Sequence, residues 1–350
     1  MEPKPFDAEA VFQRAMTAYQ TGQLEEAEQL LRIIRIEMPD HDGIMATLGG
    51  VLLASGQIAE SVEILQQALQ LNGANPDAYL NMGIAYQQSG QTDKAIAAIQ
   101  QAKQLAPERP DISYNLANVL LQIQNYPEAV QILQTVIGQQ PTFLQAYHTL
   151  GAVYQFLQKT DAAQQVYEQA LVVAPHDLQV LTTLGNLLAD TGQTDAATKI
   201  FIQTTQAHPQ HFLGYAVLGK FYLDLGKNND GLKALEKAYS LRPEDLNINI
   251  LLGNANKELG REDQAEQFYR RALDISPGDP GALSNFRRLM SSKLPYWHFE
   301  MLADSERNNA YQAAIENVVT QDTGVLAIGT GAGLLSMMAS RAGAGRVIAC

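Results

Sequence analysis

Small residues and large apolar residues recur at fixed positions along most of this chain, with a period of 34 residues that starts at Ala8. In eight successive units, positions 8 and 20 hold small residues, and positions 7, 11 and 24 mostly hold large apolar ones. This pattern predicts two helices per unit, because small residues at positions 8 and 20 allow the two helices to approach closely. The units are 8–41, 42–75, 76–109, 110–143, 144–177, 178–211, 212–245 and 246–279.

Turn residues recur with the same period. Proline stands at position 32 in seven of the eight units, where it ends the second helix, and Gly73 replaces it in the second unit. Glycine near position 15 supplies the turn between the two helices in six units, because a left-handed backbone costs little only for glycine. Gln124 and Gln158 stand there in units four and five, so we expect tighter or slightly strained turns.

After the repeats, residues 280–292 have the pattern of one more helix, which would cap the last unit. Its apolar face would consist of Leu283, Phe286, Leu289 and Met290. Lys293-Leu294-Pro295 breaks this pattern. We therefore predict three parts: repeats over 8–279, a capping helix and linker over 280–294, and a different domain over 295–350.

The last part of the chain follows a strand–helix–strand order. A helix begins after an N-cap at Asp304 or Ser305, and an apolar strand begins at Val325. A glycine-rich turn then leads into a helix, and a second strand starts at Arg346. In open α/β sheets, ligands bind at the carboxyl end of such a strand. The G-x-G-x-G spacing and the following Leu334 match neither the dinucleotide fingerprint nor the P-loop. The turn could also be only a tight strand–helix connection.

The 34-residue pattern resembles the tetratricopeptide repeat family, and this resemblance covers 272 of the 350 residues. It implies a mainly α fold, an α-solenoid that forms a right-handed superhelix. It also implies a concave groove, lined by the first helix of each unit, that binds peptides or protein segments. Positions 2, 5, 6, 9, 12 and 13 of each first helix should face this groove.

Asparagines recur at the groove-facing positions 6 and 9. Because an asparagine amide both donates and accepts, a row of them could hold an extended peptide backbone. They could equally be solvated polar residues on exposed helices. The candidate peptide-binding residues are Asn81, Asn115, Asn118, Asn186, Lys220 and Asn254. Acidic residues at position 13, such as Asp224, stand near Lys220 and argue against a cationic clamp for a carboxylate.

Charge narrows the choice of partner. The whole chain carries a net charge of −13, of which residues 1–279 contribute −14 and residues 280–350 contribute +1. An acidic surface repels nucleic acids and attracts basic segments, so we predict Lys/Arg-rich protein partners. The single cysteine, the absence of a signal-like N-terminus and the lack of a long apolar run predict a cytoplasmic location without membrane contact.

The sequence HFEMLADSER over 298–307, followed by the glycine-rich segment from Val325, resembles the protein arginine N-methyltransferases. The resemblance implies an α/β, Rossmann-like domain that binds S-adenosylmethionine. It implies that the glycines of the turn approach the cofactor, that Arg307 binds its carboxylate, and that two residues of the preceding segment close over it. The candidate cofactor-binding residues are His298, Met301, Arg307, Gly329, Gly331 and Gly333. Alternatively, the arginine is a surface residue, and the histidine and methionine are packing residues.

Two departures from this family's pattern affect the prediction. Ala327 stands where the family usually has an acidic residue before the glycine turn, and the sequence stops at Cys350. The family's ribose-binding acid, glutamate pair, histidine loop and β-barrel would follow that point. We therefore predict the N-terminal part of a methyltransferase-like protein with an incomplete cofactor site, inactive as this chain alone. The alternative is a non-catalytic repeat scaffold with a degenerate methyltransferase remnant.

Overall fold

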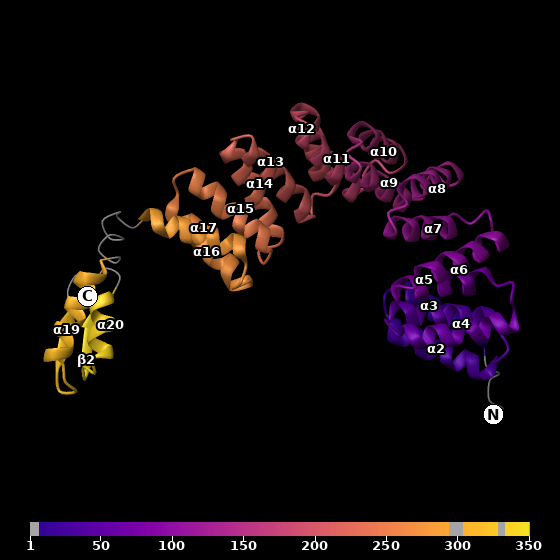
Figure 1. Cartoon of the computed structure of the whole chain (residues 1–350). Coiled ribbons are helices and arrows are strands. Elements are labelled where there is room, and N and C mark those ends of the chain that lie inside the picture. The colour runs from indigo at the N-terminus through magenta and orange to yellow at the C-terminus, as the bar shows by residue number, and fades with distance from the viewer. Residues whose placement is uncertain (1–6, 294–303, 328–332, 350) are drawn as a thin grey trace, which may run out of the picture. The chain divides into compact units, whose positions relative to one another are not determined.

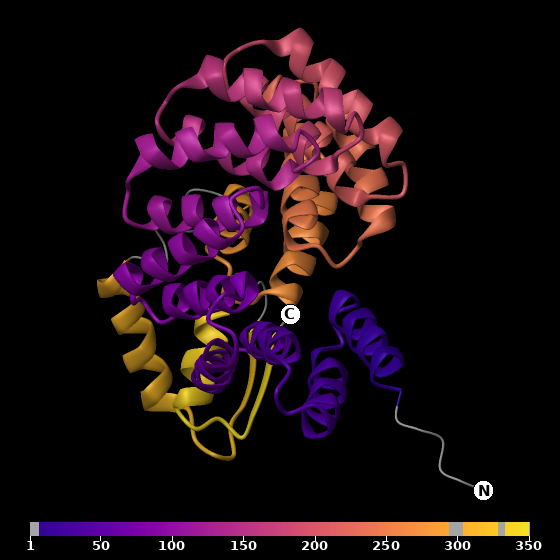
Figure 2. The same cartoon turned by 90° about the vertical axis from the view of Figure 1, so that its right-hand side faces the viewer.

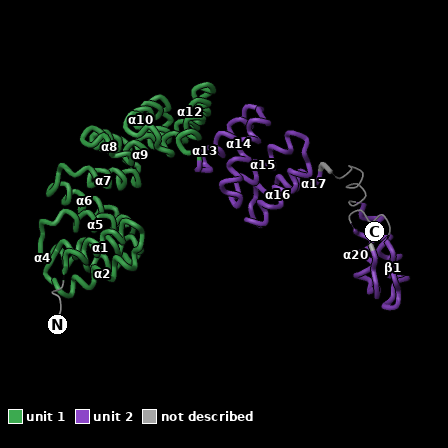
Figure 3. The backbone as a smooth tube through the Cα atoms, turned by 180° about the vertical axis from the view of Figure 1, so that it is seen from behind, with its two compact units in different colours: residues 1–209 green, residues 210–350 purple. Residues whose placement is uncertain are grey.

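The computed structural model of the chain describes residues 7–293, 304–327 and 333–349. The chain divides into two compact units, residues 1–209 and residues 210–350 (Figure 3). Helical hairpins dominate both units (Figures 1 and 2). Among the described helices, none combines the length and apolar composition that crossing a bilayer requires.

The first unit contains six helix pairs, and each first helix begins at position 1 of a 34-residue unit. The pairs are α1 (Ala8–Gln20) and α2 (Leu24–Glu37); α3 (Asp42–Ala54) and α4 (Ile58–Leu71); α5 (Pro76–Gln88) and α6 (Thr92–Leu105); α7 (Pro110–Gln122) and α8 (Tyr126–Gln139); α9 (Leu144–Phe156) and α10 (Thr160–Val173); α11 (Leu178–Asp190) and α12 (Thr194–Ala207). The predicted pairing of helices is therefore confirmed.

Within each pair, the small residue at position 8 lies against the large residue at position 24. A Cβ added to Gly185 would lie 2.5 Å from the Cε1 atom of Phe201, which is fully buried. In the preceding pair, a Cβ at Gly151 would overlap the ring of Tyr167. In these two pairs the aromatic partner leaves no room for a methyl group, so glycine is required at position 8.

The two turns that lack glycine adopt the left-handed conformation nonetheless. Gln124 has a φ of 61° and Gln158 a φ of 57°, close to the 75° of Gly192 in the next repeat. The left-handed region costs a residue with a Cβ about 1–2 kcal/mol. The hydrogen bonds of the turn are kept, since the amide of Lys159 donates to the carbonyl of Tyr154 at 2.8 Å. The expected strain is therefore located at these two residues.

The second unit begins with two further helix pairs and a single helix. They are α13 (Phe212–Asp224), α14 (Asn228–Leu241), α15 (Leu246–Glu258), α16 (Glu262–Ile275) and α17 (Pro280–Lys293). Buried Leu289 of α17 packs with Ala265 and Tyr269 of α16, and half-buried Phe286 and Met290 join them. Three of the four residues predicted for the apolar face of this helix thus pack on the last repeat, and the fourth, Leu283, is half-buried.

The remainder of the second unit contains α19 (Ser305–Val318), β1 (Gly324–Ala327), α20 (Leu334–Arg341) and β2 (Arg346–Ala349). The strands pair in parallel, with Gly324 opposite Arg346 and Ala327 opposite Ala349. Asp304 is the N-cap of α19, because its carboxylate accepts a hydrogen bond from the amide of Arg307 at 2.9 Å. The predicted strand–helix–strand order is present. These are the only two strands among the described residues, so a Rossmann-like sheet stays a prediction.

Candidate peptide-binding site

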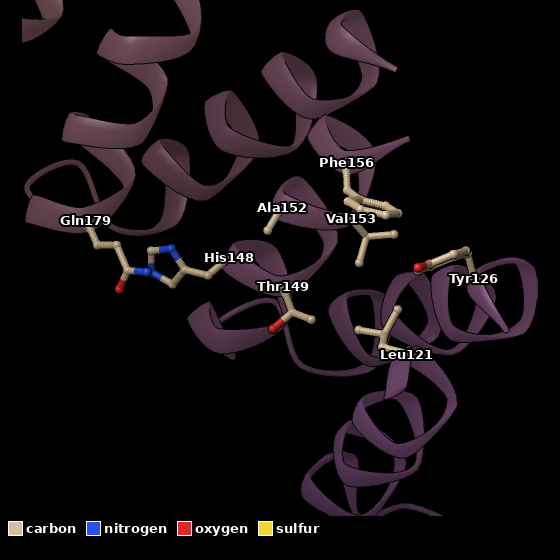
Figure 4. A pocket seen from close by; sticks show the side chains of 8 residues that line it. All are labelled: Leu121, Tyr126, His148, Thr149, Ala152, Val153, Phe156 and Gln179. Carbon is tan, nitrogen blue, oxygen red and sulfur yellow. The ribbon is translucent and has the colours of Figure 1, made fainter. Parts of the chain in front are cut away.

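The first unit has a hollow of about 460 Å³ centred on α9, which we call the α9 hollow (Figure 4). Its walls are Leu121 of α7, Tyr126 of α8, Gln179 of α11, and His148, Thr149, Ala152, Val153 and Phe156 of α9. Six of these eight residues occupy the repeat positions that were expected to face a groove. Val153 and Tyr126 stand at other positions. The first helices thus turn the expected side toward this hollow.

Two aromatic rings form one end of the α9 hollow. Phe156 is the last residue of α9 and Tyr126 the first of α8, and their ring centroids lie 5.3 Å apart at 39°. Phe156 is 69% exposed, although burial of a phenyl ring normally stabilises a fold by about 2–3 kcal/mol. A large aromatic surface therefore remains open to solvent beside a concave site, as is common where proteins bind partners.

Polar side chains form the other end. The Nε2 atom of His148 lies 3.5 Å from the carboxylate of Asp177, which also caps α11 by accepting from the amide of Val180 at 2.8 Å. Burial lowers the pKa of His148, and the charge of Asp177 opposes this effect. The imidazole is therefore mainly neutral at pH 7. Thr149 shares a hydrogen bond of 3.0 Å with the hydroxyl of Tyr114.

Charge is absent from the walls of the α9 hollow but not from its surroundings. None of the eight lining side chains is Lys, Arg, Asp or Glu. The sequence has no Lys or Arg between Arg109 and Lys159, whereas Asp111 and Glu128 fall in this interval. Residues 1–209 carry nine Lys/Arg and 21 Asp/Glu, a net charge of −12. An uncharged hollow thus lies within an acidic unit.

Several of the predicted peptide-binding residues have partners within the chain. The amide nitrogen of Asn81 donates to the carbonyl of Ala46 at 2.9 Å, and that of Asn115 donates to the carbonyl of Asp111 at 2.8 Å. The Oδ1 atom of Asn254 accepts from the hydroxyl of Tyr269 at 2.7 Å. Peptide binding by Asn81 and Asn115 would have to use the amide oxygen or the second hydrogen of the amide nitrogen. Asn254 would have to use its amide nitrogen, because its oxygen also accepts from Asn285 at 3.2 Å.

Three other predicted residues lie on the surfaces of first helices. Lys220 forms an ion pair of 2.7 Å with Asp224 one helical turn away, and both side chains are exposed. Asn186 on α11 is exposed, and Asn118 on α7 is half-buried. Both stand at the repeat position that Ala152 occupies on α9. Asn118 and Asn186 therefore belong to the helices on either side of the α9 hollow, and their role in binding stays a prediction.

The sequence reasoning missed the most distinctive residues of this site, namely Tyr126, His148 and Phe156. The predicted binding residues were asparagines and a lysine at groove-facing positions, and no prediction was made for the aromatic residues near them. One available signal was an aromatic residue at the groove-facing position 13, where the next three units have acidic residues. The missing turn glycines at Gln124 and Gln158 mark the same two repeats.

The predicted cofactor residues are only partly described by the structure. Gly333 is the N-cap of α20 with a φ of 72°, and an added Cβ would meet nothing within 4 Å. Arg307 lies in the first turn of α19, and its Nη2 atom is 3.4 Å from the amide oxygen of Asn308. Helix α19 packs against α20. The other four candidates, His298, Met301, Gly329 and Gly331, lie outside the described residues.

Comparison with known families agrees with the repeat architecture. Family profiles described as tetratricopeptide repeat match residues 8–32, 52–104, 88–153, 157–220 and 216–280. Together they cover more than half of the chain, and the paired helices follow the same period. The chain belongs to the tetratricopeptide repeat family, as its sequence predicted.

The chain is also similar to arginine methyltransferases over a short stretch. Protein arginine N-methyltransferase 9 of Xenopus laevis is 45% identical over 83 residues, which is 23% of this chain and 10% of the relative. Arginine N(omega)-methyltransferase of Streptomyces achromogenes subsp. streptozoticus is 49% identical over 65 residues, which is 19% of this chain and 18% of the relative. The chain thus matches less than a fifth of the length of either relative.

Two solved structures have a partly similar course of the chain. A chain of the APC/C hetero-tetramer Cut9–Hcn1 gives a TM-score of 0.48 at 16% identity, covering 80% of this chain and 55% of that one. YrrB, a tetratricopeptide protein with an unusual peptide-binding site, gives a TM-score of 0.43 at 18% identity, covering 57% of this chain and all of that one.

Proposed function

We propose that this chain is the substrate-recruiting part of a protein arginine methyltransferase, with its C-terminal segment contributing to an S-adenosylmethionine site. One observation carries the proposal: a tetratricopeptide array and a segment 45% identical to an arginine methyltransferase over 83 residues occur in the same chain. A repeat array supplies a binding surface but no chemistry. The similarity to arginine methyltransferases indicates the expected chemistry of the whole protein, which is methyl transfer to a guanidinium nitrogen.

The described C-terminal residues fit such a cofactor. Strand β1 ends at Ala327 and α20 begins after Gly333, so only a few residues of sequence separate the carboxyl end of the strand from the N-terminus of the helix. Among the described residues, none lies within 4 Å of a Cβ added to Gly333, which is compatible with a ligand close to its backbone. When bound, S-adenosylmethionine would supply the methyl group. Arg307 would hold its carboxylate through a planar guanidinium, and Gly333 would permit its close approach.

Basic protein segments are the partners that best suit the repeats. The first unit has a net charge of −12, which favours association with Lys/Arg-rich chains and disfavours nucleic acids. Arginine-rich segments are also the substrates that an arginine methyltransferase requires. An arginine-rich protein segment would therefore suit both the acidic repeats and the methyl transfer reaction.

Methyl transfer tests the proposal directly. The full-length product of the gene that encodes this chain would be mixed with labelled S-adenosylmethionine and an Arg/Gly-rich peptide. We expect label on arginine, and a loss of most of it when residues 8–279 are deleted. An unlabelled peptide, together with no heat of binding for S-adenosylmethionine in calorimetry, would refute the proposal.

Ala327 supports a second function, that of a non-catalytic scaffold. This residue ends β1, where the resembling family usually has a carboxylate that organises the glycine turn and the cofactor's ammonium group. A scaffold would bind basic protein segments without binding S-adenosylmethionine. Calorimetry on the natural protein and on Ala327→Asp separates the two functions. Binding by the natural protein favours the enzyme, and absence of binding in both favours the scaffold.

A further inference from the structure

The walls of the α9 hollow are suited to an uncharged side chain. Five of them are apolar or aromatic: Leu121, Tyr126, Ala152, Val153 and Phe156. The other three, His148, Thr149 and Gln179, are polar, and none carries a carboxylate. The nearby carboxylate of Asp177 is already engaged by His148 and by the amide of Val180. A lysine or arginine seated among the apolar walls would therefore lose water without a free anionic partner there, which is unfavourable. A large apolar side chain would instead cover exposed aromatic surface.

Ala152 creates the space in the middle of the hollow. The equivalent position holds asparagine in the repeats on either side, Asn118 on α7 and Asn186 on α11. Ala152 is exposed, although it lies between buried Gly151 and Val153 along the chain. A longer side chain at this position would project from the exposed side of α9 and occupy the hollow. The small size of Ala152 therefore leaves space on the surface and is not needed for packing in the core.

The two strained turns hold the aromatic rings at the edge of the hollow. Gln124 lies between Leu121 and Tyr126, and Gln158 follows Phe156 by two residues. Both rings thus stand at helix ends next to a turn whose backbone conformation is costly without glycine. Strain of this kind concentrates where a protein positions side chains for function. Both turns belong to the repeats that line the hollow, and in the other four helix pairs of the first unit the turn between the two helices has glycine.

The surroundings of the hollow determine what can flank the apolar side chain. From Pro110 to Gln158 the sequence carries two carboxylates and no cation, within a unit of net charge −12. Basic residues on either side of an apolar anchor would meet a complementary potential, whereas acidic residues would be repelled. The polar end of the hollow, at His148 and Gln179, offers side chains that can hydrogen-bond peptide groups next to the anchor.

We propose that the α9 hollow binds one large apolar side chain of an extended protein segment whose flanking residues are lysine or arginine. The proposal rests on the proposed function in that this segment would belong to the recruited substrate. It adds a specificity that charge alone does not provide. An Arg/Gly-rich segment with a Phe, Leu or Met among its arginines would be preferred over one without such a residue.

Three fluorescein-labelled peptides test this with the whole chain. The first has a single Phe flanked on both sides by Gly–Arg repeats, the second has Ala in place of Phe, and the third has Gln in place of each Arg. Binding is measured by fluorescence anisotropy at low and high salt. We expect the first peptide to bind about tenfold more tightly than the second, a difference of about 1.4 kcal/mol, because only its phenyl ring can cover the exposed aromatic surface of the hollow.

The variant Ala152→Leu should remove this preference, because its side chain would fill the hollow while an exposed helical position tolerates leucine. Val172→Ala is the matched control, since Val172 is 82% exposed on α10 of the same repeat and does not line the hollow. This control should keep the preference. Circular dichroism of each variant verifies that the helices are intact.

The outcomes separate the two proposals. Equal binding of the Phe and Ala peptides by the natural chain, or an unchanged preference in Ala152→Leu, overturns the apolar anchor but leaves recruitment of basic segments standing. Equal binding of the Arg and Gln peptides overturns the basic flanks. If none of the three peptides binds at low salt, both the hollow's role and the recruiting function of the repeats are refuted.

Discussion

The ring of Tyr167 occupies the space above Gly151, so that even a methyl group on this glycine would overlap ring atoms. The hydroxyl of Tyr167 is fixed as well, since it donates to the side-chain oxygen of Gln155 at 2.9 Å. Neither the ring nor the α9 backbone can move without disturbing the other. The contact between α9 and α10 therefore depends on glycine at this position.

Gly151→Ala should destabilise the chain by about 1–3 kcal/mol, because overpacking forces shifts in a filled interior. Urea denaturation followed by circular dichroism would measure this. Gly138→Ala is the control, since Gly138 lies within α8 and a Cβ there would meet nothing within 4 Å. It should stabilise the chain by up to about 1 kcal/mol through helix propensity. Similar effects of the two substitutions would contradict the packing argument.

Replacing a strained glutamine with glycine should stabilise the chain. Gln158→Gly is expected to raise the free energy of unfolding by about 0.5–1 kcal/mol, because the relief of a left-handed residue exceeds the entropy that glycine adds. The reverse change at the equivalent turn, Gly192→Gln, should lower it by a similar amount. If Gln158→Gly proved destabilising, the side chain of Gln158 would have a stabilising contact that outweighs its backbone cost.

His148 should make stability depend on pH in a defined window. Burial lowers the pKa of His148 in the folded chain, so the unfolded chain binds the proton more readily. Its contribution is fully present above the ordinary histidine pKa of about 6.5, and is lost as the pH falls toward the lower folded value. Below that value no further loss occurs. Comparing thermal unfolding of the natural chain and His148→Gln between pH 7.5 and 5 would show this, and a raised pKa in an NMR titration would contradict it.

Arg307 offers a test of the cofactor assignment that does not depend on turnover. In the full-length gene product, Arg307→Ala should weaken S-adenosylmethionine binding in calorimetry by about tenfold or more, since a charge-assisted bidentate contact is lost. Arg307→Lys should restore binding only in part, because an ammonium cannot reproduce the fork geometry. Arg341→Ala, at the far end of α20, serves as the control. Unchanged affinity in Arg307→Ala would remove this residue from the site.

Much of the fold could be predicted because its determinants are local. Small residues at positions 8 and 20 and proline at position 32 act within a single helix pair, so repetition of the pattern fixed the helix boundaries. The same local logic identified Gln124 and Gln158 as unusual turns. The choice between Asp304 and Ser305 as the N-cap of α19 could not be made from the sequence, because both residue types are good caps. The structure shows that Asp304 is the cap.

The α9 hollow could not be predicted in the same way because it combines residues from different repeats. Tyr126 precedes Phe156 by 30 residues, and Gln179 follows it by 23. Each looks unremarkable within its own unit, since aromatic residues also fill the core, as Tyr167 and Phe201 do. Only the packing of α8 against α9, the first helix of the next pair, shows that Phe156 remains exposed beside Tyr126.

Nearest-neighbour packing of the helices has a mechanical consequence. Within the first unit, each helix contacts chiefly the helices one or two places along the chain. A pulling force would therefore detach helix pairs one after another instead of breaking a single large core. Each detached unit of 34 residues would release a contour length of about 120 Å. Single-molecule stretching should accordingly show a series of small, evenly spaced extensions. The array would therefore extend elastically under load, as a spring does.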